Sequence, residues 1–311
     1  YNSTDGAFKS IVALEAWSSA SPMITARRLM ASSSSGPQTA ALGVGGYVDG
    51  TGDQSSTEEY NGSGFSTGTS INTARREFDG AGTQTATLVF GGRIGSNQQR
   101  AETEEFDGSS WSEQNDLNTG RQRVGGAGVQ TAALAFAGIT DGDATEEYNG
   151  TSWTAANNMG SGTYGQGASG TQTAALSCGG NPYRATTEEY DGTNWTTVNS
   201  LNTGRMFMRA SGTQTTTLAF GGKTPPNNFS TASESYDGTT WTNTPSLANA
   251  VAEQGRGGGN SAAISFGGFA PPSTSRAEEY NKSINVITAG AWASGGNMGT
   301  TRFQAAGAGS Q

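Results

Sequence analysis

Short apolar runs and polar segments alternate along the whole chain in a regular order. Residues 131–136 (TAALAF) form one apolar run, and a polar loop, the tripeptide Glu146-Glu147-Tyr148 and then Trp153 follow it. The apolar runs span only a few residues and usually end in Gly-Gly, while Asn-Gly or Asp-Gly separates the Glu-Glu-Tyr segment from the segment at the Trp. Such punctuation is typical of short strands joined by tight turns. The pattern therefore predicts an all-β protein.

The pattern is an internal repeat. The tripeptide Glu-Glu-aromatic, or its variant Glu-Ser-Tyr, recurs six times, with successive aromatic residues 46, 42, 42, 46 and 44 positions apart. Each unit offers four short candidate strands, and periods in this range indicate the blades of a β-propeller. The six aromatic positions are Tyr60, Phe106, Tyr148, Tyr190, Tyr236 and Tyr280.

The order of motifs within a unit resembles the kelch repeat. That order is Arg, an apolar run ending in Gly-Gly, Glu-x-Tyr-Asp and then Trp, and the resemblance covers essentially the whole chain. It implies a kelch-type β-propeller of four-stranded antiparallel blades. Four positions depart from the motif: Phe65 replaces Trp, Ala137 replaces the first Gly, and Thr163 and Val251 stand where Arg is expected.

The number of blades follows from counting landmarks. Seven aromatic residues occupy the Trp position, but only six apolar strands are complete, and both chain ends fall within a repeat. We expect a single propeller domain over residues 1–311 with seven blades, one of them divided between residues 1–20 and 296–311. Pairing of the N- and C-terminal strands would close it and protect exposed edges. Six blades with loose tails are the alternative, and the mid-repeat ends suggest a fragment of a longer chain.

The amino-acid composition argues against some classes of function. The chain carries 17 Lys and Arg against 26 Asp and Glu, a net charge of −9. A nucleic-acid binder normally presents a basic face, so this balance argues against nucleic acid as a partner. No apolar stretch is long enough to span a membrane, so membrane insertion is not expected. Cys178 is the only cysteine, and we expect it to be a buried structural residue without a disulfide.

The absence of histidine excludes much catalytic chemistry. Ser-His-Asp and Cys-His nucleophiles, His-ligated zinc and most proton transfer near neutral pH all need that side chain. The kelch-type copper oxidase also uses histidine, so the resemblance does not carry that activity over. We therefore expect no catalytic residues, no metal and no cofactor.

Candidate binding residues come from two sets on one predicted face. Loops of variable length after the apolar strands provide the first set, because variable loops on a fixed scaffold often carry specificity. The recurring Arg residues provide the second set, which could grip acidic sugars or a carboxylate-rich partner. Pairing of these Arg residues with the repeated Glu residues is the favoured alternative, because a ligand site normally breaks a repeat. The first set is Tyr47, Asp49, Arg93, Arg100, Lys223 and Phe229, and the second is Arg27, Arg75, Arg121, Arg205 and Arg302.

The repeats are also similar to kelch-like proteins encoded by marine bacteriophages. That similarity implies a non-enzymatic structural or interaction protein on the virion, a capsid or tail appendage for decoration or host attachment. Its partners would be other virion or surface proteins and host-surface glycans, and its location the virion surface or the extracellular space. One alternative is a secreted or cell-surface carbohydrate-binding adhesin. Another is a carbohydrate-active enzyme, which needs a non-repeating acid pair converging in the channel.

Overall fold

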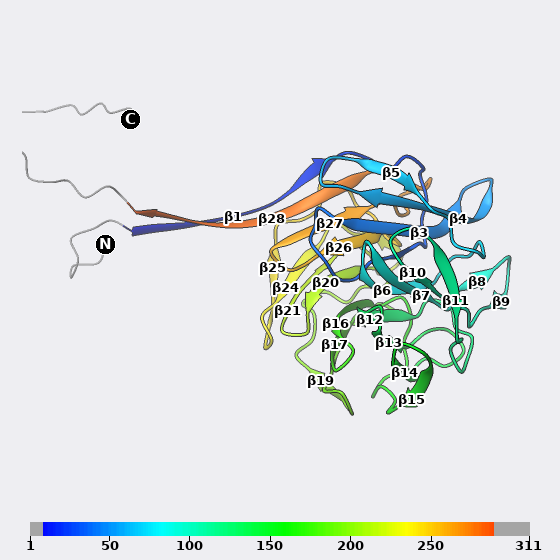
Figure 1. Cartoon of the computed structure of the whole chain (residues 1–311). Coiled ribbons are helices and arrows are strands. Elements are labelled where there is room, and N and C mark those ends of the chain that lie inside the picture. The colour runs from blue at the N-terminus through cyan, green and yellow to red at the C-terminus, as the bar shows by residue number, and fades with distance from the viewer. Residues whose placement is uncertain (1–8, 289–311) are drawn as a thin grey trace, which may run out of the picture. The chain divides into compact units, whose positions relative to one another are not determined.

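The computed structural model describes residues 9–288, and the described residues form strands and turns without any helix (Figure 1). Within them, no segment is a helix long and apolar enough to cross a membrane. Contacts divide the chain into two units, residues 15–283 and residues 1–14 with 284–311. The first unit is a β-propeller of small four-stranded antiparallel blades.

Six sheets of four strands make up the propeller, and each is called a blade here. Blade 1 is β2 (Ala31–Ser32), β3 (Ala41–Val48), β4 (Gly52–Tyr60) and β5 (Phe65–Gly68). Blade 2 is β6 (Asp79–Thr83), β7 (Ala86–Phe90), β10 (Thr103–Phe106) and β11 (Trp111–Gln114). Blade 3 is β12 (Gly125–Val129), β13 (Ala132–Phe136), β14 (Thr145–Tyr148) and β15 (Trp153–Ala156).

The second half of the propeller repeats this order. Blade 4 is β16 (Gly167–Thr171), β17 (Ala174–Cys178), β18 (Thr187–Tyr190) and β19 (Trp195–Val198). Blade 5 is β20 (Arg209–Thr213), β21 (Thr216–Phe220), β24 (Ser233–Tyr236) and β25 (Trp241–Thr244). Blade 6 is β26 (Gly255–Gly258), β27 (Ala262–Phe266), β28 (Ala277–Thr288) and β1 (Lys9–Ala20). Loop hairpins pair β8 (Arg93–Ile94) with β9 (Gln98–Gln99) and β22 (Lys223–Thr224) with β23 (Asn228–Phe229).

The prediction of seven blades is wrong, because two landmarks that were counted in different blades belong to one. The Trp17 ring packs against the Tyr280 ring, with centroids 5.4 Å apart, just as Tyr148 packs against Trp153 within blade 3. The N-terminal strand β1 is thus the fourth strand of blade 6, beside β28. The predicted closing strand at residues 302–311 lies outside the described residues.

The first strand of each blade surrounds the central axis. These strands contact one another in the order β2, β6, β12, β16, β20, β26 and back to β2. They approach so closely that small residues are needed: a Cβ on Gly126 would lie 2.9 Å from the carbonyl oxygen of Gly80 in the neighbouring blade. This crowding therefore explains glycines of the inner strands such as Gly80 and Gly126.

The repeated side chains join neighbouring blades. The Tyr148 hydroxyl donates to Glu105 of the preceding blade at 3.1 Å, and the Trp153 indole donates to Thr103 at 2.9 Å. On the side of the Gly-Thr-Gln-Thr turns, the Gln172 amide donates to the carbonyl oxygens of Ala133 and Tyr148 at 3.1 and 2.6 Å. Equivalent bonds recur in most blades, so one set of residues stabilises the propeller at each interface.

Candidate functional site

The recurring Arg residues lie in the interior of the blades. Arg121 has no exposed surface, and its Nη2 lies 2.9 Å from Oε1 of Glu146, while its Nη1 donates to the carbonyl oxygens of Ala137 and Ala144. Burial lowers the pKa of this guanidinium, and the Glu146 charge opposes that shift. The same ion pair recurs at Arg27–Glu58, Arg75–Glu104 and Arg205–Glu234, at 2.9, 3.1 and 3.0 Å.

This placement agrees with the structural pairing that the sequence favoured. The four described Arg residues are fully buried, so none presents its guanidinium at the surface of the propeller. The fifth candidate, Arg302, lies outside the described residues. In blades 4 and 6, Thr163 and Val251 occupy the Arg position. Backbone amides donate to the corresponding Glu188 and Glu278, as they also do to the Glu of the Arg-containing blades.

In each blade, the residue two positions after the Arg position hydrogen-bonds to its equivalents in the neighbouring blades. These six residues form a closed circle of backbone hydrogen bonds, which we call the axis ring. Each member has a φ between 57° and 66°, a left-handed conformation that is unusual for side chains other than glycine. Each amide donates to the carbonyl oxygen of the member in a neighbouring blade, at 2.6 to 3.4 Å. The six members are Leu29, Glu77, Arg123, Gly165, Phe207 and Glu253.

The axis ring repeats in its backbone but not in its side chains. Its six equivalent positions hold one aliphatic, one aromatic, one basic and two acidic residues, and one glycine. These residues line a small cavity of about 40 Å³ at the mouth of the axis, together with Gln166 and Arg209. We call this end of the axis, formed by the axis ring and the side chains around it, the mouth. At the ring positions of the mouth, the side chains differ from blade to blade although the backbone repeats.

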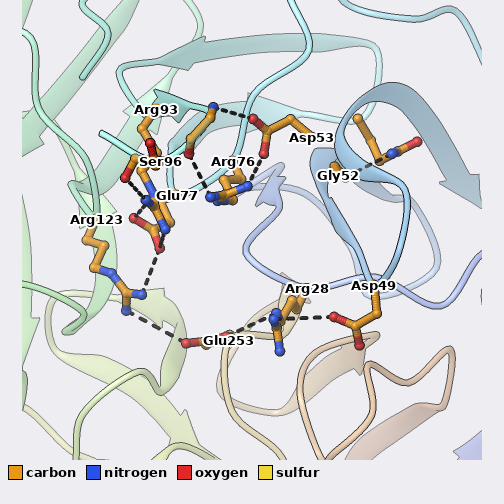
Figure 2. Close-up of polar contacts among 12 residues, drawn as sticks. Arg28, Asp49, Gly52, Asp53, Arg76, Glu77, Arg93, Ser96, Arg123 and Glu253 are labelled. Carbon is orange, nitrogen blue, oxygen red and sulfur yellow. Dashed lines mark hydrogen bonds and ion pairs between the residues drawn. The ribbon is translucent and has the colours of Figure 1, made fainter. Parts of the chain in front are cut away.

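Ion pairs surround this mouth (Figure 2). Arg123 lies between two acids, with Nη2 2.7 Å from Glu77 and Nη1 3.7 Å from Glu253. Arg93 contacts the same Glu77 at 2.8 Å, and Arg28 lies 3.9 Å from Glu253. Opposite charges thus alternate along the network, and Glu77 has a side chain only 1% exposed. No group of three or more His, Cys, Asp or Glu side chains in residues 9–288 could hold a metal ion.

The extended hairpin of β3 and β4 joins this network to the neighbouring blades. Asp49 pairs with Arg28 at 3.3 Å and accepts from the backbone amide of Ser273 in blade 6 at 2.8 Å. Asp53 pairs with Arg76 and accepts from the amide of Gly95 in blade 2 at 2.7 Å. The hydrogen bond from the backbone amide of Ser273 lowers the pKa of Asp49. Loops of three blades are therefore fixed to one another.

Aromatic rings stand beside most of the cations at the mouth. Tyr47 lies between Arg28 and Arg76, whose guanidinium carbons are 5.3 and 4.5 Å from its ring centroid. Lys223 lies 4.7, 5.7 and 5.8 Å from the centroids of Phe229, Phe269 and Phe207. Burial lowers the pKa of the Lys223 ammonium, and the charge of Glu253 opposes the shift.

Below the mouth, charged side chains cross the axis. Arg209 of blade 5 reaches Asp79 of blade 2 at 3.4 Å, and its Nη2 donates to the carbonyl oxygen of Met30 at 2.8 Å. Arg256 of blade 6 contacts the same Asp79 at 3.3 Å and donates to the carbonyl oxygen of Gly126 at 3.0 Å. The Arg209–Asp79 and Arg256–Gly126 contacts join opposite blades, so these side chains span the axis.

The structure brings together five of the loop residues that the sequence singled out. Tyr47, Asp49, Arg93, Lys223 and Phe229 all lie around the mouth. The sixth, Arg100, pairs with Glu102 in its own loop, outside the mouth network.

Sequence reasoning missed the axis ring itself, together with Arg28 and Arg76. A signal was present, because each ring member follows the Arg position by two residues, where the repeat changes from blade to blade. What the sequence does not show is that these six positions share one left-handed backbone conformation and meet at the axis.

No known protein family matches the chain, and no curated protein matches it at a significant level.

Proposed function

We propose that this protein is a non-enzymatic recognition module that binds its partner over the mouth of the propeller axis. One observation carries the proposal: the six structurally equivalent positions of the axis ring hold five different residue types, although the Arg, Glu and Tyr positions of the blades largely repeat. A requirement of the fold acts equally on every blade and selects the same residue each time. A binding surface acts on one place and needs different chemistry from each blade.

The rigidity of the mouth supports this proposal. Asp49 and Asp53 fix the end of the β3–β4 hairpin to blades 6 and 2, and the ion pairs of Arg123 hold the ring side chains in place. A surface ordered before binding loses little conformational freedom when a partner docks. The mouth also combines aromatic and arginine side chains, which are enriched where proteins bind one another.

The setting we propose is the surface of a bacteriophage particle, where the propeller decorates the virion or attaches to the host. The similarity of the repeats to kelch-like proteins of marine bacteriophages supports this setting. The partner would be another virion protein or a host-surface glycan. A secreted or cell-surface adhesin would use the same mouth, and the two differ in whether the protein is assembled into particles.

The test compares a mouth variant with a matched control. The double variant Arg123→Gly and Phe207→Gly places at two ring positions the residue that blade 4 already has at Gly165, so the backbone should keep its conformation. The control is Val129→Thr, a change at an exposed position far along the same inner strand from the mouth.

We expect the original protein and the control to bind purified particles, host cells or members of a glycan array, and the mouth variant to lose that binding. Equal binding by the folded mouth variant would place recognition elsewhere and contradict the proposal. The absence of any binding by the original protein to particles, cells and glycans would contradict it as well.

Carbohydrate hydrolysis is a second candidate, favoured by one observation. Glu77 and Glu253 are non-repeating acids that line the same cavity, as a glycosidase would require. However, Arg123 lies between the two carboxylates and contacts both, which fits a structural network better than a proton donor and a nucleophile. Release of reducing sugar from a glycan, lost in Glu77→Gln, would establish the enzyme instead.

A further inference from the structure

Lys223 differs from the other cations at the mouth. Arg28, Arg76, Arg93 and Arg123 each contact a carboxylate. Lys223 makes no ion pair with any acid in the described part of the chain, and its closest neighbours are the three phenyl rings already described. The residue as a whole is only 8% exposed, so its stem is covered while its ammonium has no described carboxylate within ion-pair distance. An anionic group that reaches this ammonium gains a strong charge-assisted hydrogen bond.

The adjoining cavity offers the opposite chemistry, because two hydrogen-bond acceptors in its lining, on Gln166 and Glu253, receive no hydrogen bond from any described donor. Gln166 is 4% exposed and lines the cavity, and no described group donates to its Oε1. Glu253 contacts guanidinium groups only at 3.7 and 3.9 Å, beyond hydrogen-bond distance. A ligand group that reaches Gln166 and Glu253 in the cavity must therefore bring hydrogen-bond donors, although Arg123 and Arg209 also line it.

The size of the cavity limits what enters it. About 40 Å³ accommodates one or two groups the size of a water molecule, such as a hydroxyl, but not a sugar ring. The ring of Phe207 borders both places, because it lines the cavity and lies 5.8 Å from the Lys223 ammonium. A single small molecule with a carboxylate at one side and hydroxyls at the other can therefore span them.

We propose that the mouth binds an acidic sugar, with its carboxylate on Lys223 and a hydroxyl in the cavity bonded to Gln166 and Glu253. The C–H face of the sugar then packs on the exposed parts of the phenyl rings beside Lys223. This inference rests on the proposed function and names its ligand class. It also gives the acidic-sugar hypothesis a different residue from the recurring Arg residues, which are buried.

The probes are methyl glucuronide and methyl glucoside, which differ only in the carboxylate. Binding is measured by calorimetry at low ionic strength and by NMR shifts of the Gln166 side-chain amide. We expect the glucuronide to bind about tenfold more tightly or better than the glucoside, since a hydrogen bond to a charged group contributes that much. Equal affinities, or no binding of either sugar at millimolar concentrations, would overturn the inference.

Three variants, two at Lys223 and one at Gln166, separate the contributions of these residues. Lys223→Met keeps an apolar stem among the phenyl rings and should remove the preference for glucuronide, whereas Lys223→Arg should retain it. Gln166→Met introduces the residue found at the equivalent positions Met30 and Met208, and it should weaken both sugars alike. The control is Lys282→Met, which removes a lysine that pairs with Glu15 away from the mouth.

The outcome also distinguishes this inference from the proposed function. If the Arg123 and Phe207 variant loses particle or cell binding but Lys223→Met retains it in full, recognition at the mouth stands and the acidic sugar is wrong. A preference for glucuronide that persists in Lys223→Met would likewise refute the role of this lysine.

Discussion

Arg121 and Arg123 stand two residues apart in the same blade, but they differ in burial and in the blades that they contact. Arg121 belongs to the repeat, has no exposed surface and pairs with Glu146 within its own blade. Arg123 belongs to the axis ring, has an 18% exposed side chain and contacts acids of two other blades. Arginine stands at the first position in four of the described blades and at the second in only one.

This comparison separates the framework of the propeller from its mouth. In the framework, the buried ion pair recurs in four of the described blades, and the Tyr–Glu bond and the Gln bonds to the preceding blade recur in most of them. In the mouth, the backbone repeats while the chemistry of the side chains changes. The framework should therefore determine stability, and the mouth should determine binding.

High pH should break the framework most completely. Five tyrosine hydroxyls donate to glutamates, and burial, with the Glu279 carboxylate, raises the pKa of Tyr60 to about 12. The folded pKa lies above the unfolded value of about 10, so the unfolded chain loses its protons first. The contribution of Tyr60 to the stability of the folded state is therefore complete below pH 10 and decreases between pH 10 and 12. Urea unfolding midpoints from pH 8 to 12 measure this loss. The other four tyrosines are Tyr148, Tyr190, Tyr236 and Tyr280.

The control for this prediction is Tyr148→Phe, because Phe106 is the natural residue at the equivalent position of blade 2. The variant should lose part of the alkaline decrease. A midpoint that does not change above pH 10, or phenol groups that ionise near pH 10 in the folded protein, would contradict the assigned role of the tyrosines.

Removal of one framework guanidinium should have the next largest effect. Arg121→Met leaves the Glu146 carboxylate buried without its partner, and breaking a buried ion pair costs about 3–5 kcal/mol. Chemical denaturation measures the free energy of unfolding. The double variant Arg121→Met with Glu146→Gln should recover a large part of the loss, and a single variant as stable as the original protein would show that the pair is not structural.

The framework could largely be predicted from the sequence, because repetition reveals it. The Arg–Glu pairing, the four strands of a blade and the propeller follow from the spacing of Arg121, Tyr148 and Trp153. The number of blades could not be predicted, since nothing in the spacing shows that Trp17 completes the blade of Tyr280. The ends of the repeat depend on contacts between distant parts of the chain.

The mouth could be predicted only in part. Loop length identified Tyr47, Asp49, Arg93, Lys223 and Phe229, since variable loops lie on one face of a propeller. The ring members Glu77 and Arg123 lie just before the inner strands, in segments that have the same length in every blade. Variation in loop length therefore does not reveal them. Their convergence depends on the left-handed backbone at the axis.

Replacing a glutamate by glutamine in the mouth and in the framework sharpens the comparison between these two regions. Glu77→Gln should cost about 1–2 kcal/mol, because its partners Arg93 and Arg123 are partly exposed and water can replace part of the interaction. Glu146→Gln should cost more, because Arg121 is fully buried. The loss in Glu77→Gln should also shrink at high salt. Equal losses for the two variants at low salt would remove the distinction between framework and mouth.

Arg123→Gly should have the smallest effect on stability. The substitution removes the contacts to Glu77 and Glu253, which are partly hydrated and contribute modestly. It also relieves the left-handed strain at a φ of 59°, while glycine adds freedom to the unfolded chain. These changes oppose one another, so the free energy of unfolding should remain within about 1 kcal/mol of the original, as denaturation would measure. A loss as large as that of Arg121→Met would mean that Arg123 belongs to the framework after all. A small loss in stability, together with lost binding by the ring variant, would show that these two arginines, two positions apart, serve the fold and its recognition surface separately.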